Sequence, residues 1–205
     1  MTDEITGAGL GDAKSAPHDR ATNGPLDESE ANAVRPYVDL GGVKILPRAD
    51  LQLRLEVEDG SKRVVAVGLD YAGSTLQVQP FAAPRNTGLW HEIRAQIVDQ
   101  IHKQGGTTRI ANGSFGPEVQ AQIPVAGAPG APASSRLARF IGVDGPRWFL
   151  RGVIAGDAIV NADSAAKVEE LFRSIVVVRG TTPMPPRDLI PLHMPNAGGS
   201  GPVDL

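Results

Sequence analysis

The feature that most constrains the fold is a repeated alternation of apolar and polar side chains. Residues 51–57, LQLRLEV, place an apolar side chain at every second position, which is typical of a strand with one buried face. The alternation returns in residues 62–71 and 75–83, after the short turns DGSK and AGS. Because turns this short join neighbouring antiparallel strands, the sequence predicts consecutive hairpins. Residues 43–47, VKILP, are expected to add a short edge strand before them.

The period changes in two segments, which are predicted to be helices. In residues 86–106 the apolar side chains recur every three or four positions. Asn86 or Thr87 is the expected N-cap, and a Gly-Gly pair at the end is the expected stop. Residues 163–175 repeat the helical pattern. The side chains expected to be buried, from helices and strands together, are Trp90, Ile93, Ile97, Trp148, Leu150, Leu171 and Phe172.

The remaining segments return to the strand period. Strands resume between residues 107 and 125, and residues 136–145 and 147–156 form a predicted hairpin around an Asp-Gly turn. Residues 175–180, IVVVRG, are expected to close the same sheet. This order of elements indicates an α+β fold with a mainly antiparallel sheet packed against two helices.

Composition divides the chain of 205 residues into three parts. Residues 1–34 hold seven acidic and two basic side chains and few large apolar ones, so they are predicted to be a disordered acidic tail. Residues 35–195 are predicted to be a single α+β domain, whose last part, from Gly180, is a proline-rich arm lying extended along the domain. Residues 196–205 are expected to be a flexible tail.

Composition also excludes several function classes. The chain has no cysteine, which rules out disulfides, a thiol nucleophile and thiolate zinc sites, and which fits a reducing cytoplasm. The acidic tail carries −5 of the overall charge of −3, which leaves +2 on the domain, too little to indicate a nucleic-acid partner. Neither a secretory signal nor an apolar segment long enough to span a membrane is present. We therefore expect a cytoplasmic protein.

No residues form a recognisable catalytic or metal-binding pattern. His91 and His102 are eleven positions apart on the predicted helix, about 16 Å, which is too far to share a metal ion. Ser114 lacks the G-x-S-x-G frame of a nucleophile elbow. The sequence thus predicts no catalytic residue, no metal and no cofactor, and it favours a protein that is not an enzyme.

Arginines supply the one candidate binding site. Arg147 and Arg151 flank Phe149 in RWFLRGVIAG and, on a strand, would share the face opposite to Trp148. With Arg179 and Arg187 they could form an anion site, because paired guanidinium groups suit phosphate or carboxylate. Alternatively, the first two arginines pair with nearby aspartates and stack on Phe149, while Arg187 with its neighbouring aspartate anchors the proline-rich arm.

Three segments resemble a known family. PFAAPRNTGLWHEIRAQI, GPRWFLRGVIAG and VVVRGTTPMPPRDLIPLHMP are similar to an actinobacterial family known only as domain of unknown function 3710. The resemblance covers Tyr37 to Pro195 and implies a cytosolic protein, but the family brings no established reaction and no catalytic residues. The order of elements also resembles the PsbP/Mog1-like α+β sandwich.

These observations favour a non-catalytic protein-interaction or scaffold module with a protein partner. The alternative is a binder of a small anionic ligand or nucleotide through an arginine-lined face, and a hydrolase comes third. The two leading hypotheses differ in whether Arg147, Arg151, Arg179 and Arg187 converge in one concave pocket. The sequence predicts no oligomeric state.

Overall fold

The computed structural model describes residues 13–127, 129 and 134–195. Its first sheet consists of β4 (Gln52–Val57), β5 (Val64–Tyr71), β6 (Ser74–Ala82), β7 (Thr107–Gly113), β8 (Gly116–Val125), β9 (Ser134–Asp144) and β10 (Trp148–Gly156). A second sheet consists of β1 (Leu26–Asp27), β2 (Val38–Asp39), β3 (Val43–Ile45) and β11 (Val176–Val177). The helices are α1 (Arg20–Asn23), α2 (Trp90–Lys103) and α3 (Ala162–Arg173), with 3-10 turns at Glu28–Glu30 and Asp157–Ile159.

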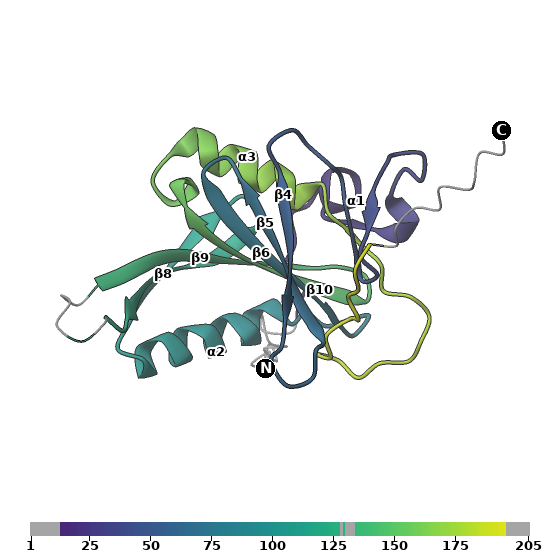
Figure 1. Ribbon diagram of the computed structural model, residues 1–205. Coiled ribbons are helices and arrows are strands. Elements are labelled where there is room, and N and C mark those ends of the chain that lie inside the picture. The colour runs from purple at the N-terminus through teal and green to yellow at the C-terminus, as the bar shows by residue number, and fades with distance from the viewer. Residues whose placement is uncertain (1–12, 128, 130–133, 196–205) are drawn as a thin grey trace, which may run out of the picture.

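The large sheet carries a helix on each face. Its strand order is β4-β5-β6-β10-β9-β8-β7, and every neighbouring pair is antiparallel. Helix α2 lies along one face and α3 along the other (Figure 1). The α+β class predicted from the alternating periods is confirmed, as is its mainly antiparallel sheet.

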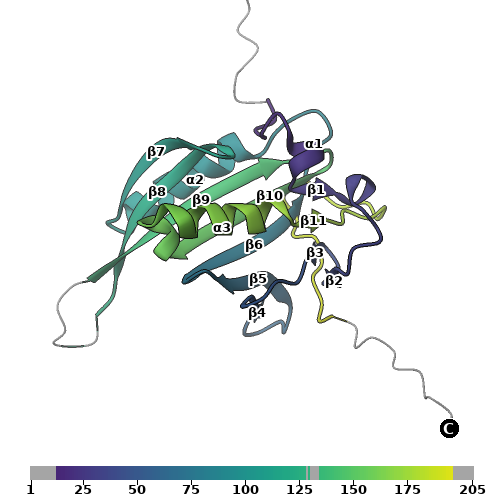
Figure 2. The same ribbon diagram turned by 90° about the horizontal axis from the view of Figure 1, so that it is seen from above.

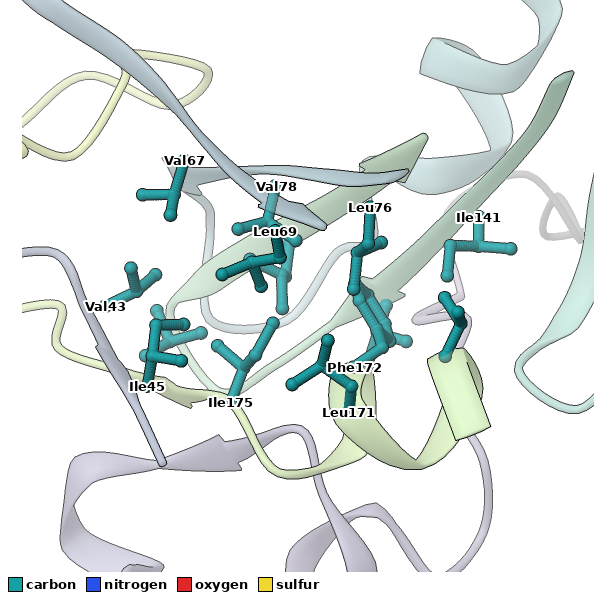
Figure 3. Packing of buried hydrophobic residues seen from close by; sticks show 14 of the residues in the cluster. Val43, Ile45, Val67, Leu69, Leu76, Val78, Ile141, Leu171, Phe172 and Ile175 are labelled. Atoms are coloured by element: carbon teal, nitrogen blue, oxygen red, sulfur yellow. The ribbon is translucent and has the colours of Figure 1, made fainter. Parts of the chain in front are cut away.

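Strand alternation divides the core into two parts. On one face of the large sheet, side chains such as Leu76, Val78 and Leu150 pack against α3 and the small sheet (Figure 3). On the other face, Phe149 packs beneath Trp90 and Ile97 of α2. Of the side chains expected in the core, all are buried except Ile93, which is partly buried at the edge of the α2 cluster.

The small sheet corrects two expectations about strands. Residues 43–47 and 175–180 were both expected in the main sheet, but β3 and β11 pair with each other instead. Their side chains Val43, Ile45 and Val177 are fully buried between the small sheet and the large one. A strand of two or three residues shows its apolar character but not its pairing partner, so only the tertiary structure assigns it to a sheet.

Helix α2 begins differently from the prediction. Neither Asn86 nor Thr87 caps it, and the residue before its first turn, Leu89, provides no side-chain cap. The carboxylate of Asp144, at the end of β9, instead accepts hydrogen bonds from the backbone N–H groups of Leu89 (2.8 Å) and Trp90 (3.4 Å). The cap therefore comes from a residue 54 or 55 positions away in the chain.

The expectation of a disordered tail over residues 1–34 is wrong for residues 13–34, and residues 1–12 lie outside the described residues. Strand β1 pairs in parallel with β11, and Asp27 accepts a hydrogen bond from the indole N–H of Trp148 (2.9 Å). Lys44 pairs with Glu28 (2.8 Å) and Arg173 with Asp19 (3.5 Å), which are ion pairs between the domain and this segment. The segment is ordered because backbone hydrogen bonds and ion pairs to the domain replace the apolar burial that its composition cannot supply.

The proline-rich arm lies along the domain. Ile190 and Leu192 are buried, and the backbone N–H of Ile190 donates to the carbonyl of Pro80 (2.9 Å). Leu192 forms isolated bridges with Gly41 and Val64. The arm thus joins both sheets. The predicted flexible tail, residues 196–205, lies outside the described residues.

Candidate functional site

A large groove lies between the C-terminal half of α3, the N-terminal segment and the loop after β3. Its volume is about 1040 Å³, and a smaller hollow of about 260 Å³ shares Arg35 and Tyr37 with it. We call the two together the tyrosine groove, because Tyr37 and Tyr71, the only tyrosines of the chain, both line it. Figure 2 shows α1 and the small sheet gathered beyond the end of α3.

Several elements bring the side chains of the groove together. Arg48 comes from the loop after β3, and its guanidinium bonds the carboxylate (3.1 Å) and the backbone carbonyl (3.4 Å) of Glu170 in α3. The same guanidinium lies over the ring of Tyr71, 5.9 Å from its centre. The Nε of Arg48 is buried without a hydrogen-bond partner among the described residues. Arg48 therefore holds the loop and the tyrosine against the helix.

The charges of the larger hollow are only partly balanced. Four basic and three acidic side chains line it, of which Arg48–Glu170 and Arg173–Asp19 (3.5 Å) are ion pairs. This leaves the exposed Arg35 and Lys167, neither of which has an ion-pair partner among the described residues, against Asp50. The larger hollow therefore carries one more positive than negative side chain, although the net charge of the whole chain is −3.

Two of the four arginines predicted as an anion site lie together. Arg147 and Arg179 line a cleft of about 340 Å³ that also contains Asp27, Ser29 and Gly180. We call it the arginine cleft. Burial first, and then the neighbouring charge of Arg147, lower the pKa of Arg179. The two guanidinium groups are therefore close enough to repel each other.

The other two arginines lie elsewhere, so the four do not converge. Arg151 sits on the α2 face of the large sheet, where its guanidinium bonds Gln79 and lies 5.8 Å from the ring centre of Phe81. Desolvation lowers the pKa of Arg151. Arg187 pairs with Glu92 in the first turn of α2. Arg187 thus anchors the proline-rich arm, as the alternative hypothesis predicted, but its partner is Glu92 and not the adjacent aspartate.

The start of β10 and the burial of its second face explain why Arg147 and Arg151 lie apart. Arg147 precedes β10, which begins at Trp148, so the strand alternation does not include it. The face shared by Phe149 and Arg151 is also not solvated, because α2 covers it and Phe149 is fully buried. The sequence indicated one covered face, whereas the structure covers both.

The arrangement of hydroxyl, imidazole and carboxylate groups offers little for catalysis. Ser114 donates to Glu169 (2.6 Å), which also pairs with Arg139, and no histidine of the described residues forms a hydrogen bond with Ser114. Thr108 and His102 contact each other at 2.8 Å, but neither lines the tyrosine groove or the arginine cleft. Among the described residues no group of three histidine, cysteine or acidic side chains could hold a metal ion.

The sequence could not identify the tyrosine groove. Its residues come from five places in the chain, and apart from the exposed side of α3 most of them lie in loops or at element ends, where no periodic pattern applies. Tyr71, the last residue of β5, is partly buried and packs against the core, and it also lines the groove. The feature of the sequence that could have drawn attention to the groove is the small number of tyrosines. The chain has two, and the structure places one in a loop and the other at the end of β5.

Within the part of the chain that the structure describes, no helix has the length and apolar character needed to cross a membrane. No curated protein matches the sequence. The solution structure of cyanobacterial PsbP (CyanoP) from Synechocystis sp. PCC 6803 is similar over 67% of this chain and 87% of that chain, at 8% identity and a TM-score of 0.39. A score of this size supports no conclusion beyond the likeness itself.

The family comparison is more extensive. A family model described as "Protein of unknown function (DUF3710)" matches residues 24–199. The match begins within the ordered N-terminal segment, at Gly24, and includes the whole proline-rich arm. It therefore spans both sheets, all of α2 and α3, the arginine cleft, and the tyrosine groove except for Asp19, Thr22 and Asn23. This chain belongs to the DUF3710 family of proteins of unknown function.

Proposed function

We propose that the protein is a non-catalytic interaction module that binds an extended, acidic segment of a partner protein in the tyrosine groove. The observation that carries the proposal is the groove itself, whose two hollows lie side by side and share Arg35 and Tyr37 as lining residues. Tyrosine and arginine are the residue types that contribute most to protein interfaces. They supply apolar area, hydrogen bonds and charge together.

The tyrosine groove as a whole is lined by five basic and five acidic side chains, and the acidic partner is inferred from the unpaired cations of its larger hollow. Arg35 and Lys167 are exposed and have no carboxylate partner among the described residues, whereas Glu170 and Asp19 are already occupied by arginines. An acidic segment would complete these charges without displacing an existing ion pair. Such contacts accelerate association and weaken with added salt.

The shape of the groove selects an extended segment. Strand β2, whose Asp39 lines the smaller hollow, is an edge strand of the small sheet. An edge strand can accept a further strand from a partner through backbone hydrogen bonds. Side chains of the added segment would then alternate between the tyrosines and solvent.

Three further observations support the rest of the proposal. The histidine and serine contacts described above lack the third, orienting group that nucleophilic catalysis needs, which supports a binding role. The absence of cysteine supports a cytoplasmic location. The small positive charge of the domain supports a protein partner rather than nucleic acid.

The test places a photo-reactive phenylalanine analogue at Tyr71 in the full chain and identifies the crosslinked peptides by mass spectrometry. We expect crosslinks to an acidic segment that is extended in its own protein. That segment, made as a synthetic peptide, should bind the purified protein, and Lys167→Glu should weaken binding by about tenfold or more, since it reverses an interface charge.

The matched control is Arg136→Glu, which reverses an exposed charge on β9, away from the groove, and should leave the affinity unchanged. Equal losses in both variants would assign the effect to overall charge and overturn the groove. Crosslinked segments without acidic character would overturn the proposed partner chemistry.

A further inference from the structure

We infer that the arginine cleft is a separate site for a phosphate-type dianion, held between the guanidinium groups of Arg147 and Arg179 as inorganic phosphate or as a small phosphate ester. The site does not depend on the tyrosine groove: the cleft shares none of its arginine residues with it, and the occupant is a small ion rather than a polypeptide.

The two arginines approach each other without a neutralising partner. Neither forms an ion pair with an acidic side chain among the described residues. Arg179 donates only to the backbone carbonyl of Thr182 (3.0 Å), and its Nε is buried without a hydrogen-bond partner in the described part of the chain. Two cations in contact with one cleft repel each other unless an anion lies between them.

The carboxylates of the cleft are already committed to other groups. Asp27 accepts hydrogen bonds from the indole of Trp148 (2.9 Å) and from the hydroxyl (2.6 Å) and backbone N–H (3.1 Å) of Ser29. Glu28 pairs with Lys44 at 2.8 Å. Asp27 stays negatively charged, since its donors are neutral, but it forms no ion pair with Arg147 or Arg179 among the described residues, and both acidic groups order the N-terminal segment.

The backbone beside Arg179 is open. Gly180 has a φ of 65° and no atom within 4 Å of where a Cβ would stand. The backbone N–H groups of Gly180 and Thr181 have no acceptor among the described residues, so they could supplement the guanidinium groups. Paired guanidinium groups with backbone N–H donors are the arrangement that binds phosphate oxygens.

The size of the cleft favours an ester. Its volume of about 340 Å³ is at the lower end of the range of about 300–1,000 Å³ for small-molecule sites. A phosphate group alone leaves part of this space empty, and a small organic substituent would fill it. Charge also favours phosphate over a carboxylate, because a dianion balances both guanidinium groups.

The experiment measures binding to the full chain by calorimetry with inorganic phosphate, glycerol 3-phosphate, sulfate and acetate as probes. We expect both phosphates to bind. If glycerol 3-phosphate binds more tightly than inorganic phosphate, the occupant is an ester; if inorganic phosphate binds more tightly, the occupant is the free ion. Arg147→Gln and Arg179→Gln should each weaken phosphate binding by about tenfold or more, because each removes one charge-assisted contact.

Dependence on pH separates phosphate from a general anion effect. The second pKa of a phosphate ester is about 6, so between pH 5 and 7.5 the affinity for glycerol 3-phosphate should rise by up to about tenfold, while the affinity for sulfate should stay constant. The titratable acids of the cleft are Asp27 and Glu28. Burial opposes ionisation of Asp27, but the hydrogen bonds from Ser29 and Trp148 lower the pKa of this carboxyl, so it stays charged over that range.

The control is Arg136→Gln, which removes an exposed arginine outside the cleft. Thermal unfolding of each variant shows that it is folded, and Arg147→Lys keeps the charge should the glutamine variant fail to fold. Phosphate binding that is the same in Arg147→Gln as in the parent chain, or that falls equally in Arg136→Gln, would overturn the site. Absence of binding by both phosphates would overturn it too.

Discussion

Replacing Asp144 by alanine should destabilise the protein. This side chain is 3% exposed and joins three separate segments. It accepts hydrogen bonds from the backbone N–H groups of Leu89 (2.8 Å), Trp90 (3.4 Å) and Ser15 (2.9 Å). The first two are the start of α2, and the third belongs to the N-terminal segment.

The magnitude follows from these contacts. Losing an N-cap costs about 1 kcal/mol, and losing a hydrogen bond to a charged group costs about 1.5–3 kcal/mol when the donor stays buried. Desolvation of the carboxylate offsets part of this cost, because burial raises the pKa of Asp144 although backbone hydrogen bonds oppose the rise. We therefore expect Asp144→Ala to lower the free energy of unfolding by about 3 kcal/mol.

The assay is urea unfolding followed by circular dichroism, with Asp99→Ala as the control. Asp99 is an exposed residue of α2 paired only with Lys103, so its loss should cost less than about 0.5 kcal/mol. The raised pKa of Asp144 also sets the direction in which the penalty changes with pH. The contribution of Asp144 is fully present below its ordinary pKa and falls as the pH rises through the folded-state value, so the penalty should be larger at pH 4 than at pH 8. A penalty below about 1 kcal/mol at both pH values would refute the reasoning.

Three further outcomes are expected. Gly24 has a φ of 75°, and a Cβ there would collide with the backbone carbonyl of Arg173. Gly24→Ala should therefore cost at least about 2 kcal/mol in chemical unfolding, whereas Gly60→Ala, with open space around it, should be near neutral. Ile190, 3% exposed in the proline-rich arm, should lose about 2–4 kcal/mol on replacement by alanine, measured in the same way; a neutral effect would mean that the arm contributes no packing. The N-terminal segment should detach in acid. Hydrogen bonds lower the pKa of Asp27 despite its burial, so the stability it contributes is present above its ordinary pKa of about 4 and is lost as the pH falls through the lower folded value. The indole N–H signal of Trp148 in nuclear magnetic resonance spectra should shift in that range, and Asp27→Asn should abolish the transition.

Local periodicity determined the secondary structure. Strands 52–57, 64–71 and 74–82, the hairpin of β9 and β10, and both long helices follow from patterns of apolar side chains over six or more residues. A pattern of this length reports which face is buried, because burial of one face is what keeps the segment folded. Val168, Leu171 and Phe172 are buried on α3 for this reason.

The candidate sites were predicted less well, because they depend on which segments meet. Arg147 and Arg179 were in the predicted anion set, but nothing in the sequence separated them from Arg151 and Arg187, which lie against Phe81 and Glu92. The tyrosine groove was not predicted at all. Arginine side chains are long enough to reach several neighbours, so their partners follow from packing and not from spacing.

The sequence by itself thus determined the α+β class, the helices, the long strands and most of the core, since these depend on contacts repeated every two to four residues. Only the tertiary structure decided three other features: the order of residues 13–34, the pairing of β3 with β11, and the capping of α2 by Asp144. Each rests on single hydrogen bonds or ion pairs between residues far apart in the chain. Such contacts have no period, and so the segments that make them are recognised only when the fold brings them together.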